Sequence, residues 1–414
     1  MSHSFLVRTL CGGLVLLALL TQARADNWPR FRGDNGTGIV NDEACPTEFD
    51  GKKPLWKIKP PGGGNSSPII WGGKIFLNTE GENGKERGLA CIELATGKLL
   101  WQTSEVGATA RIHKKNSLAS GTPATDGVRV YTPIWDGEKL TIYAFDFAGK
   151  EVWTHDVGPF ASQHGAGHSP IVHQNKVIFS NDQDGTSSML ALDAESGKVL
   201  WDTPRPAKSA CYSTPFIYEQ PGRPAEVVVA STMGFAGFEL EKGTESWHWD
   251  WNGNSLRTVG SPVFGAGVAV VGSGNGGGNR NTAAVLLGGK GDVTKTNLAW
   301  SEKQALPYVP CMLIWGENLF FVNDRGIAGC YIARTGEKVW DNKRLNGSVT
   351  ASPILVNGRI IAINDNGEVF TIAAEPNYKL LSRTQLDDAV TASPAVSDGH
   401  LVIRGHEYLF CFKK

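Results

Sequence analysis

The feature that most constrains the fold is a short motif that the chain repeats. Its fullest copy, residues 191–201, reads A-x-D-x-x-x-G-x-x-x-W: an apolar strand, a turn with Gly, and a second apolar strand that ends on Trp. Strand, turn and strand in this order predict a β-hairpin. Partial copies cover residues 91–101, 144–153, 237–247 and 330–340. Repetition at a few tens of residues is typical of propellers and other repeat folds.

A second marker shares this period. It is a small or polar residue followed by Pro and an apolar strand, and Pro suits the first residue of a strand because its missing N–H is harmless there. Eight copies are spaced 41 to 55 residues apart. Their first residues are Ser67, Thr122, Ser169, Thr214, Ser261, Val309, Ser352 and Ser393.

Counting strands against these markers gives a closed ring. The eighth marker starts strands that run to residue 412, and the chain ends before a fourth strand. An isolated strand at 54–58, which precedes every complete repeat, supplies the missing one. The sequence therefore predicts an all-β fold, an eight-bladed β-propeller of four-stranded antiparallel blades closed by the N-terminal strand. Residues 54–414 form this single domain, after an irregular lead-in at 26–53.

Strand-ending tryptophans are expected to hold the blades together. Each buries ~150–250 Å², which is worth roughly 4–6 kcal/mol before opposing terms. The eighth position, near Leu381, has no Trp. The seven residues assigned to this docking role are Trp56, Trp101, Trp153, Trp201, Trp247, Trp300 and Trp340.

The first 25 residues read as a secretory signal peptide. Arg8 precedes an apolar run at 10–20, and Ala23 and Ala25 suit the cleavage site. We expect an exported, soluble protein that begins at Asp26, in the periplasm or secreted, with no lipid anchor. No stretch reaches the ~20 apolar residues of a transmembrane segment. With 40 basic and 41 acidic side chains, the chain shows no sign of binding nucleic acid.

Cysteine usage leaves one question open. Cys91, Cys330 and Cys411 fall where other repeats have Ala or Gly, which favours packing as small apolar residues over disulfide pairing. Export would permit disulfides at Cys45, Cys211 and Cys311, and their state stays undecided. The chain has no C-x-x-C motif, which removes the spacing of a haem attachment or zinc-ribbon site.

Three stretches carry a family resemblance. The 191–201 motif, the W-P-x-F-R-G opening at 28–33 and the K-N-S-x-A-S-x-T-P stretch at 115–123 resemble the PQQ-like (quinoprotein-type) β-propeller repeat proteins, in their bacterial exported branch. The resemblance spans the mature chain. That family is similar to the propeller subunit of the outer-membrane assembly machinery and, distantly, to the dehydrogenases that use pyrroloquinoline quinone (PQQ).

The resemblance implies a binding protein, with an enzyme as the alternative. Scaffold members hold partners through rim loops, whereas the dehydrogenases place two adjacent cysteines over the quinone and bind Ca²⁺ near the axis. Here no two cysteines are adjacent, and the calcium positions have no match. We therefore expect a monomeric scaffold in the cell envelope with a protein or peptide partner, and no cofactor, catalytic residue or metal ligand. The alternative is a small PQQ-dependent dehydrogenase, with calcium, that oxidises an alcohol or sugar.

Candidate binding residues stand where inner strands begin, because those ends crowd the axis. The longest connection, residues 102–121, is read as an anion- or peptide-binding lip or as a solvated basic loop. His164 and His168 form an H-x-x-x-H pair whose glycines predict a loop, so hydrogen bonding is favoured over metal binding. The glycine-rich stretch 272–279 is expected to be a blade hairpin rather than a phosphate loop.

Three further residues near the Pro markers either reach the axis or pack within the blades. The complete candidate set is Arg111, His113, Lys115, Asn116, His164, His168, Tyr212, Arg257 and Tyr308, with Lys114 in the same loop.

Overall fold

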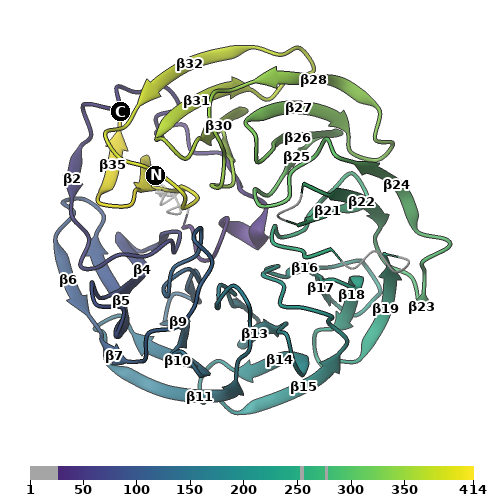
Figure 1. Ribbon diagram of the computed structural model, residues 1–414, viewed down its shortest axis with the longest axis horizontal. Coiled ribbons are helices and arrows are strands. Elements are labelled where there is room, and N and C mark those ends of the chain that lie inside the picture. Colours follow the sequence, from purple (N-terminus) through teal and green to yellow (C-terminus); the bar gives the residue numbers. More distant parts are fainter. Residues whose placement is uncertain (1–26, 252–255, 276–277) are drawn as a thin grey trace, which may run out of the picture.

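The computed structural model describes residues 27–251, 256–275 and 278–414. The predicted signal peptide at 1–25 lies outside these residues. The described residues form eight antiparallel sheets arranged as a ring around one axis (Figure 1). The predicted all-β, eight-bladed propeller is confirmed, and a single short 3₁₀ helix, η1 (Asp34–Gly36), accompanies the strands in the described part of the chain.

Each of the first four blades is a four-stranded meander in chain order. Blade 1 contains β3 (Ile69–Trp71), β4 (Lys74–Glu80), β5 (Glu86–Glu93) and β6 (Leu99–Gln102), and β7 (Glu105–Val106) also pairs with β5. Blade 2 contains β8 (Ala124–Thr125), β9 (Arg129–Trp135), β10 (Lys139–Asp146) and β11 (Glu151–Pro159). Blade 3 contains β12 (Ile171–His173), β13 (Lys176–Asn181), β14 (Ser187–Asp193) and β15 (Val199–Arg205). Blade 4 contains β16 (Phe216–Tyr218), β17 (Glu226–Ala230), β18 (Gly234–Glu239) and β19 (Glu245–Asp250).

The other four blades repeat the plan with additions at two edges. Blade 5 contains β20 (Val263–Gly265), β21 (Val268–Gly274), β22 (Arg280–Leu286) and β24 (Leu298–Lys303), while its β23 (Gly291–Asp292) pairs in parallel with β19 of blade 4. Blade 6 contains β25 (Leu313–Trp315), β26 (Asn318–Val322), β27 (Ile327–Ile332) and β28 (Lys338–Arg344). Blade 7 contains β29 (Ile354–Val356), β30 (Arg359–Ile363), β31 (Glu368–Ala373) and β32 (Leu380–Gln385), with β1 (Ile39–Val40) parallel to β29. Blade 8 contains β33 (Ala395–Ser397), β34 (His400–Arg404), β35 (Leu409–Lys413) and β2 (Trp56–Ile58).

The N-terminal strand closes the ring as the sequence predicts. Strand β2 lies antiparallel along the outside of β35, with Trp56 opposite Cys411 (Figure 1). The last blade therefore takes strands from both ends of the chain. The strands that flank the glycine-rich stretch pair as expected, since β21 pairs with β22 from Val268 opposite Leu286 to Gly274 opposite Arg280.

The small residues of the Pro markers form a ring of hydrogen bonds around the axis. In each bond, a backbone N–H donates to the side chain of the matching residue in the next blade, as from Thr122 to Ser169 at 2.9 Å. Seven such bonds join consecutive blades. We call this set the hydroxyl ring: Ser67, Thr122, Ser169, Thr214, Ser261, Cys311, Ser352 and Ser393.

The sixth marker lies two residues later in the structure than the sequence pattern predicts. The sequence pattern put the sixth marker at Val309, but Cys311 stands in the ring, where it accepts from Ser261 N and donates its own N–H to Ser352. The strand β25 begins at Leu313, two residues later, as in the other blades. The cause is that Met312 takes the place of the usual Pro, while Pro310 comes one residue before the ring position.

Six of the seven strand-ending tryptophans contact the next blade. Their indole N–H groups donate to backbone carbonyls of the neighbouring turn at 2.8 to 3.3 Å. Trp153, for example, donates to Ala194 O and covers Gly197, whose φ is +71° and whose position has no room for a Cβ. The six residues are Trp56, Trp101, Trp153, Trp201, Trp300 and Trp340.

Trp247 departs from the expected docking role. Its indole N–H donates to Glu226 Oε2 within its own blade, and it lies against Gly237. The turn of blade 5 that would receive it is enlarged, and β23 from that turn folds back beside Trp247. The indole is fully buried by this insertion instead of by a docking turn.

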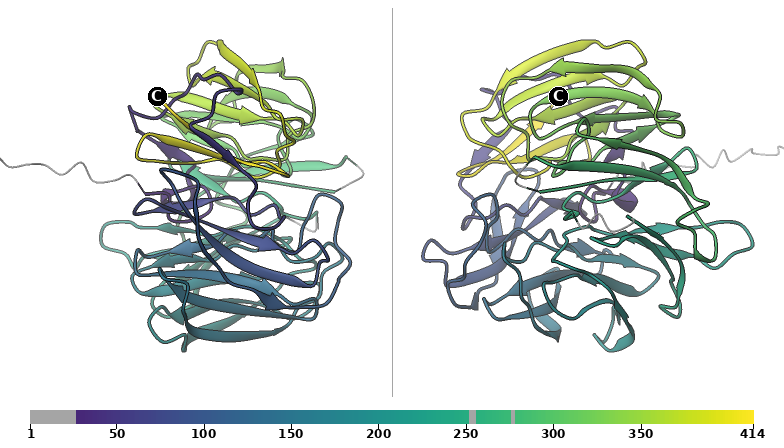
Figure 2. Two further views of the ribbon diagram at one scale, coloured as in Figure 1. Left: turned by 90° about the vertical axis from the view of Figure 1, so that its left-hand side faces the viewer. Right: turned by 45° about the vertical axis from the view of Figure 1, so that its right-hand side comes forward.

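The hydrophobic core is divided among the interfaces between blades. Separate buried clusters lie between successive blades, such as the one that joins Phe179 of blade 3 to Tyr131 of blade 2. The six cysteines of the described residues are buried and form no disulfide among themselves. Figure 2 shows the ring from the side, with turns and loops standing at its two faces. Within the described residues, no helix is long and apolar enough to cross a membrane.

The lead-in covers the axis on one face of the ring. Trp28 pairs with Ile70 of blade 1, and β1 pairs with β29 of blade 7, so the segment between them crosses the centre, where Figure 1 shows η1. Arg30 donates to Pro215 O, and Arg32 donates to Pro353 O and Met312 O, both at 2.7 Å. Burial lowers the pKa of Arg30 to about 9 and also lowers the pKa of Arg32. Two buried cations thus tie this end of the axis to blades 4, 6 and 7.

Candidate functional site

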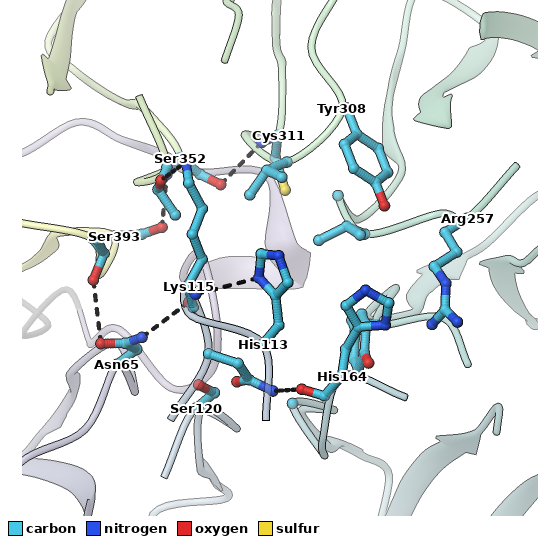
Figure 3. A pocket seen from close by; sticks show the side chains of 18 of the residues that line it. Asn65, His113, Lys115, Ser120, His164, Arg257, Tyr308, Cys311, Ser352 and Ser393 are labelled. Atoms are coloured by element: carbon cyan, nitrogen blue, oxygen red, sulfur yellow. Dashed lines mark hydrogen bonds between the residues drawn. The ribbon is translucent and has the colours of Figure 1, made fainter. Parts of the chain in front are cut away.

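The opposite face holds a cavity of about 510 Å³ on the axis. The hydroxyl ring forms much of its base, together with Phe31 from the lead-in. Side chains from the connections between blades form its wall, and Figure 3 shows several of them converging. The cavity is therefore closed towards the lead-in and lined towards its mouth by the loops that the sequence singled out. We call it the axial cavity.

The connection from blade 1 to blade 2, residues 103–121, reaches over this cavity. Its base is fixed by Arg87, which donates to Ala108 O, and by Glu80, which accepts from Leu118 N at 2.6 Å. Asn116 Nδ2 donates to His164 O at 2.7 Å and Ala166 O at 3.0 Å. These bonds hold the tip of the connection, residues 113–116, at the cavity wall. We call residues 103–121 the axial loop.

Lys115 extends from the axial loop to blade 7, which blade 8 separates from blade 1. Its Nζ lies 2.9 Å from Thr350 Oγ1 and 3.4 Å from Asp365 Oδ2, both contributed by blade 7 and its approach. Asn65 Nδ2 donates to the carbonyl of Lys115 at 3.1 Å. The ion pair is partly exposed, and it links two sides of the ring across the cavity.

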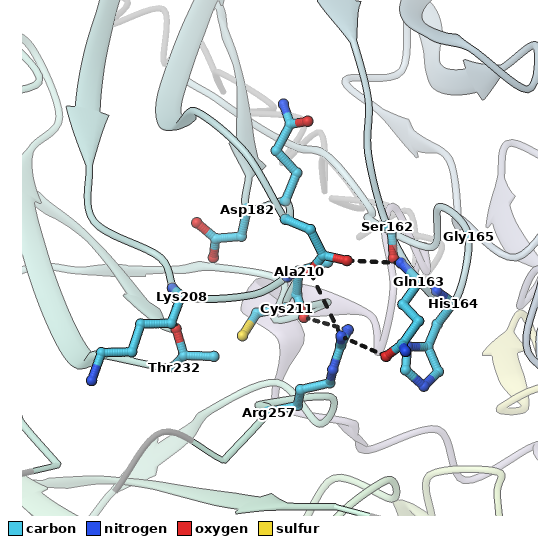
Figure 4. Close-up of polar contacts among 12 residues, drawn as sticks. Ser162, Gln163, His164, Gly165, Asp182, Lys208, Ala210, Cys211, Thr232 and Arg257 are labelled. Carbon is cyan, nitrogen blue, oxygen red and sulfur yellow. Dashed lines mark hydrogen bonds and ion pairs between the residues drawn. The ribbon is translucent and has the colours of Figure 1, made fainter. Parts of the chain in front are cut away.

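Arg257 lies on the side of the cavity nearest blades 3 and 4. Its backbone forms an isolated antiparallel bridge with Gly274. The guanidinium contacts Ala210 O at 3.3 Å, Gln163 Oε1 at 3.5 Å and Asp184 Oδ1 at 3.6 Å (Figure 4). All three contacts are long, so the guanidinium is positioned but keeps hydrogen-bonding capacity for a ligand.

Two tyrosines of the wall differ in their availability. The Tyr212 hydroxyl is engaged, since it pairs with Ser162 Oγ at 2.9 Å and donates to Gly165 O at 3.0 Å. The Tyr308 hydroxyl makes no hydrogen bond within the described residues, and Figure 3 shows it directed into the cavity. Burial raises the pKa of Tyr308 to about 12. This hydroxyl is a neutral donor at physiological pH.

Blade 6 and its approach hold the backbone at Tyr308 in place. Asp324 accepts from Tyr308 N at 2.7 Å and from Val309 N at 3.2 Å. Its carboxylate also lies 3.8 Å from Arg280, whose guanidinium stands 4.8 Å from the centre of the Tyr308 ring. Asp324 is the one carboxylate among the described residues that line the cavity, and these contacts occupy it.

The two histidines of the H-x-x-x-H pair occupy different environments. His164 lines the cavity, with its ring centre 5.2 Å from that of His113. Burial lowers its pKa, as do the positive charges of Arg257, His113 and Arg111, against the opposing effect of Asp184.

His168 is buried beneath the wall. Its Nε2 pairs with Asp182 O at 3.0 Å, and burial lowers its pKa to about 4. The pair therefore does not present two rings to one ligand.

The structure brings most of the predicted site residues to one cavity. Arg111 is an exception, since it lines a shallower groove beside the axial cavity together with Lys208 and Arg257. His168 is the other exception. The residues that line the axial cavity are His113, Lys115, Asn116, His164, Tyr212, Arg257 and Tyr308, with Lys114.

Sequence reasoning missed several members of the site. Asp365 and Asp184 stand behind Lys115 and Arg257, and their pairing depends on the closed ring, which leaves no local signal. Arg280 is the first residue of β22 and follows the glycine-rich stretch. A cation beside a hairpin that starts near the axis could have been nominated from the sequence as a binding residue. The hydroxyl ring also had a signal, because the residue before each Pro is small and polar in nearly every blade.

The donors of the cavity do not fit a calcium-bound quinone. No group of three or more His, Cys, Asp or Glu side chains in the described residues is arranged to hold a metal ion. The carboxylate that lines the cavity, Asp324, already accepts two backbone N–H groups. Ca²⁺ takes six to eight oxygen ligands, usually with several carboxylates among them, whereas this lining offers one carboxylate beside neutral hydroxyl and amide oxygens.

Comparisons with known proteins agree with this architecture. The crystal structure of BamB from Moraxella catarrhalis is similar with a TM-score of 0.61 and 14% identity, over 87% of this chain and 96% of that one. Quinohemoprotein alcohol dehydrogenase from Comamonas testosteroni gives a TM-score of 0.67 and 12% identity, over 94% of this chain and 80% of that one. At these identities the likeness concerns the fold. No curated protein sequence matches the chain.

A family model gives the more specific result. The model described as outer membrane protein assembly factor BamB matches residues 138–376, more than half of the chain. The match runs from blade 2 to blade 7 and includes the complete motif at 191–201. The chain therefore belongs to the BamB-type family of PQQ-like β-propellers.

Proposed function

We propose that this protein is an exported binding or scaffold propeller of the cell envelope, which holds a protein or peptide partner on the face with the axial cavity. The observation that carries the proposal is the shape of the axis. The lead-in covers one end with Arg30 and Arg32, and side chains from several blades converge at the other. A closed-ended cavity with convergent polar groups is the usual form of a ligand site.

The character of the wall favours binding over catalysis. Tyr308, His164 and Lys114 offer donors to the cavity, and Asp324 is committed to backbone N–H groups. A general base must be a free acceptor within reach of the substrate. Burial lowers the pKa of His164, and the charges of Arg257, His113 and Arg111 lower it further, which makes its imidazole a weaker base.

The proposal is tested by photo-crosslinking in the producing cell. A photoreactive residue at position 114, at the tip of the axial loop, is compared with one at Val128, an exposed turn residue on the lead-in face. We expect a discrete adduct with an envelope protein from position 114 and none from position 128. Equal adducts from both positions, or adducts from 128 alone, would contradict the proposed face.

A separate measurement tests the alternative function, a PQQ-dependent dehydrogenase. The purified chain is supplied with PQQ and Ca²⁺, and dye-linked oxidation of alcohols and sugars is recorded. The proposal predicts no turnover. Turnover that Arg257→Ala abolishes would establish the dehydrogenase alternative and overturn the scaffold proposal.

A further inference from the structure

We propose that the axial cavity is a receptor for a single carboxylate group attached to an apolar body, such as the C-terminal end of a peptide. The carboxylate is seated between Arg257, His164 and Tyr308, beneath the axial loop. This inference rests on the proposed function, because it names the chemistry that the cavity would recognise in a partner.

Unpaired polar atoms at one side of the cavity wall indicate which ligand groups would bind there. The Tyr308 hydroxyl has no hydrogen-bond partner within the described residues. His164 Nδ1 is buried and also has none, and it donates in the tautomer that carries the proton on this nitrogen. Figure 3 shows His164 and Tyr308 on the same side of the cavity as Arg257. The carboxylate there, Asp324, is occupied, since it accepts from two backbone N–H groups. A buried polar group without a partner is costly, and a ligand that only accepts hydrogen bonds would satisfy the Tyr308 hydroxyl and a His164 Nδ1–H together.

Most of the charged side chains that line the cavity are cationic. Four cationic side chains line the cavity, Lys114, Lys115, Arg257 and Arg280, with the single carboxylate of Asp324, in a chain whose formal net charge is −1. A concave site lined by one sign of charge concentrates ligands of the opposite sign. Burial lowers the pKa of His164, and the charges of Arg257, His113 and Arg111 lower it further against Asp184, which agrees with a positive potential at this wall.

Partial neutralisation of the cavity's cations limits the ligand to about one negative charge. Lys115, Arg257 and Arg280 each have a carboxylate 3.4 to 3.8 Å away, which offsets much of their charge. A dianion such as phosphate needs several uncompensated cations, whereas a carboxylate accepts well from an Arg fork assisted by neutral O–H and N–H donors. This arrangement matches a monoanion.

The cavity is much larger than a carboxylate group. A volume of about 510 Å³ far exceeds what a carboxylate fills. The remaining wall includes Phe31, Val259 and Val309, which suit an apolar side chain next to the carboxylate. The small-acid and peptide sources share this chemistry, and the experiment separates them.

The test is calorimetric titration of the full chain. Acetyl-Ala-Ala-Phe with a free C-terminal carboxylate is compared with its C-terminal amide, with 3-phenylpropionate and with inorganic phosphate. We expect the free-acid peptide to bind and the amide to bind at least tenfold more weakly. Comparable binding of 3-phenylpropionate would identify a small acid as the source and keep the carboxylate assignment. Equal affinity for peptide acid and amide, binding of phosphate alone, or no binding of either carboxylate at millimolar concentration would overturn it.

Matched variants place the site. Arg257→Gln is expected to weaken free-acid binding at least tenfold, and Tyr308→Phe, which keeps the ring in place, several-fold. Arg223→Gln changes an exposed arginine of a groove in blade 4 away from the cavity and should alter affinity less than twofold. An equal loss in Arg223→Gln and Arg257→Gln would contradict the assignment. A crosslink from position 114 without carboxylate binding would leave the proposed function standing and remove this inference alone.

Discussion

The backbone N–H of Ser393 donates to the hydroxyl of Ser67 at 3.1 Å, although 326 residues separate them in the sequence. This bond is the link of the hydroxyl ring between the last blade and the first. At the rim, the pairing of Trp56 with Cys411 joins the same two ends of the chain. The propeller is therefore closed twice, once at the axis and once at the outer edge.

Removing the closing segment should open the ring. Deletion of residues 26–60 takes away β2, which leaves the edge of β35 unpaired, and also removes Arg30 and Arg32 from the axis. We expect loss of the single cooperative thermal transition across all blades, measured by calorimetry and circular dichroism. A truncated chain that melts cooperatively near the temperature of the full chain would contradict closure by β2.

The contact between Gly197 and Trp153 should be sensitive to one methyl group. In Gly197→Ala the Cβ would lie 2.7 Å from the indole, on a backbone with φ of +71°. Overpacking adds ~1–3 kcal/mol to the ~1–2 kcal/mol of a left-handed Ala. Gly358→Ala is the control, since its φ is +70° and no atom lies within 4 Å. Urea denaturation should show the larger loss for Gly197→Ala, and equal losses would mean that docking adds nothing.

The buried ion pair between Arg205 and Asp182 predicts a pH-dependent variant. Arg205 Nε lies 3.2 Å from Asp182 Oδ1, and burial raises the pKa of Asp182 to about 6 although Arg205 opposes this. In Arg205→Met the carboxylate is buried without a partner, which costs ~3–5 kcal/mol while it is charged. Loss of Arg205 raises the pKa of Asp182 further in the variant, so we expect the loss in unfolding free energy to be largest at alkaline pH and to shrink as the pH falls towards about 6, below which Asp182 is protonated in both proteins.

Two comparisons isolate this effect. Burial lowers the pKa of His168 to about 4 and Arg205 lowers it further, so His168 also reduces the unfolding free energy as the pH falls below 6.5, by a smaller amount in the variant; the comparison is therefore made at pH 6.5 and above. Lys139→Met breaks an exposed pair with Asp156 and should cost ~1 kcal/mol or less. A pH-independent loss in Arg205→Met would show that Asp182 stays charged in the fold.

Asp365 should restrain carboxylate binding. Its Oδ2 lies 3.4 Å from Lys115 Nζ, so Asp365→Asn releases a cation beside the cavity. A partly exposed pair is worth ~0.2–1 kcal/mol, and we expect the free-acid peptide to bind about two- to fivefold more tightly by calorimetry. Asp387→Asn, which breaks a pair with Lys57 at the rim, should leave the affinity unchanged. Weaker binding in Asp365→Asn would assign Lys115 a purely structural role.

The fold was predictable because its signals are local and repeated. The strand turns, the residue before each Pro and the Trp that ends seven of the eight blades lie within one repeat, so the repeated pattern identifies the fold even where one copy is irregular. The failures are local too. Cys311 lacks its Pro, and Trp247 meets a turn that an insertion has enlarged, so neither follows the consensus of its neighbours.

The site was predictable only in part, because it is made by closure of the ring. Residues of the axial loop could be nominated, since a long basic connection at the axis is visible in the sequence. The partner of Lys115 is 250 residues away, and nothing near Asp365 indicates it. The lead-in reads as irregular because Arg30 and Arg32 donate to carbonyls of distant blades rather than to a local element.

Hydrogen exchange with and without saturating acetyl-Ala-Ala-Phe tests the central claim, that the face with the axial cavity is the binding face. The account predicts slower exchange at residues 113–118 of the axial loop, where Asn116 already bonds to His164 O and Ala166 O. It predicts no change in the turn at 126–128 on the lead-in face. Protection confined to the lead-in face, or no protection of the axial loop, would contradict it.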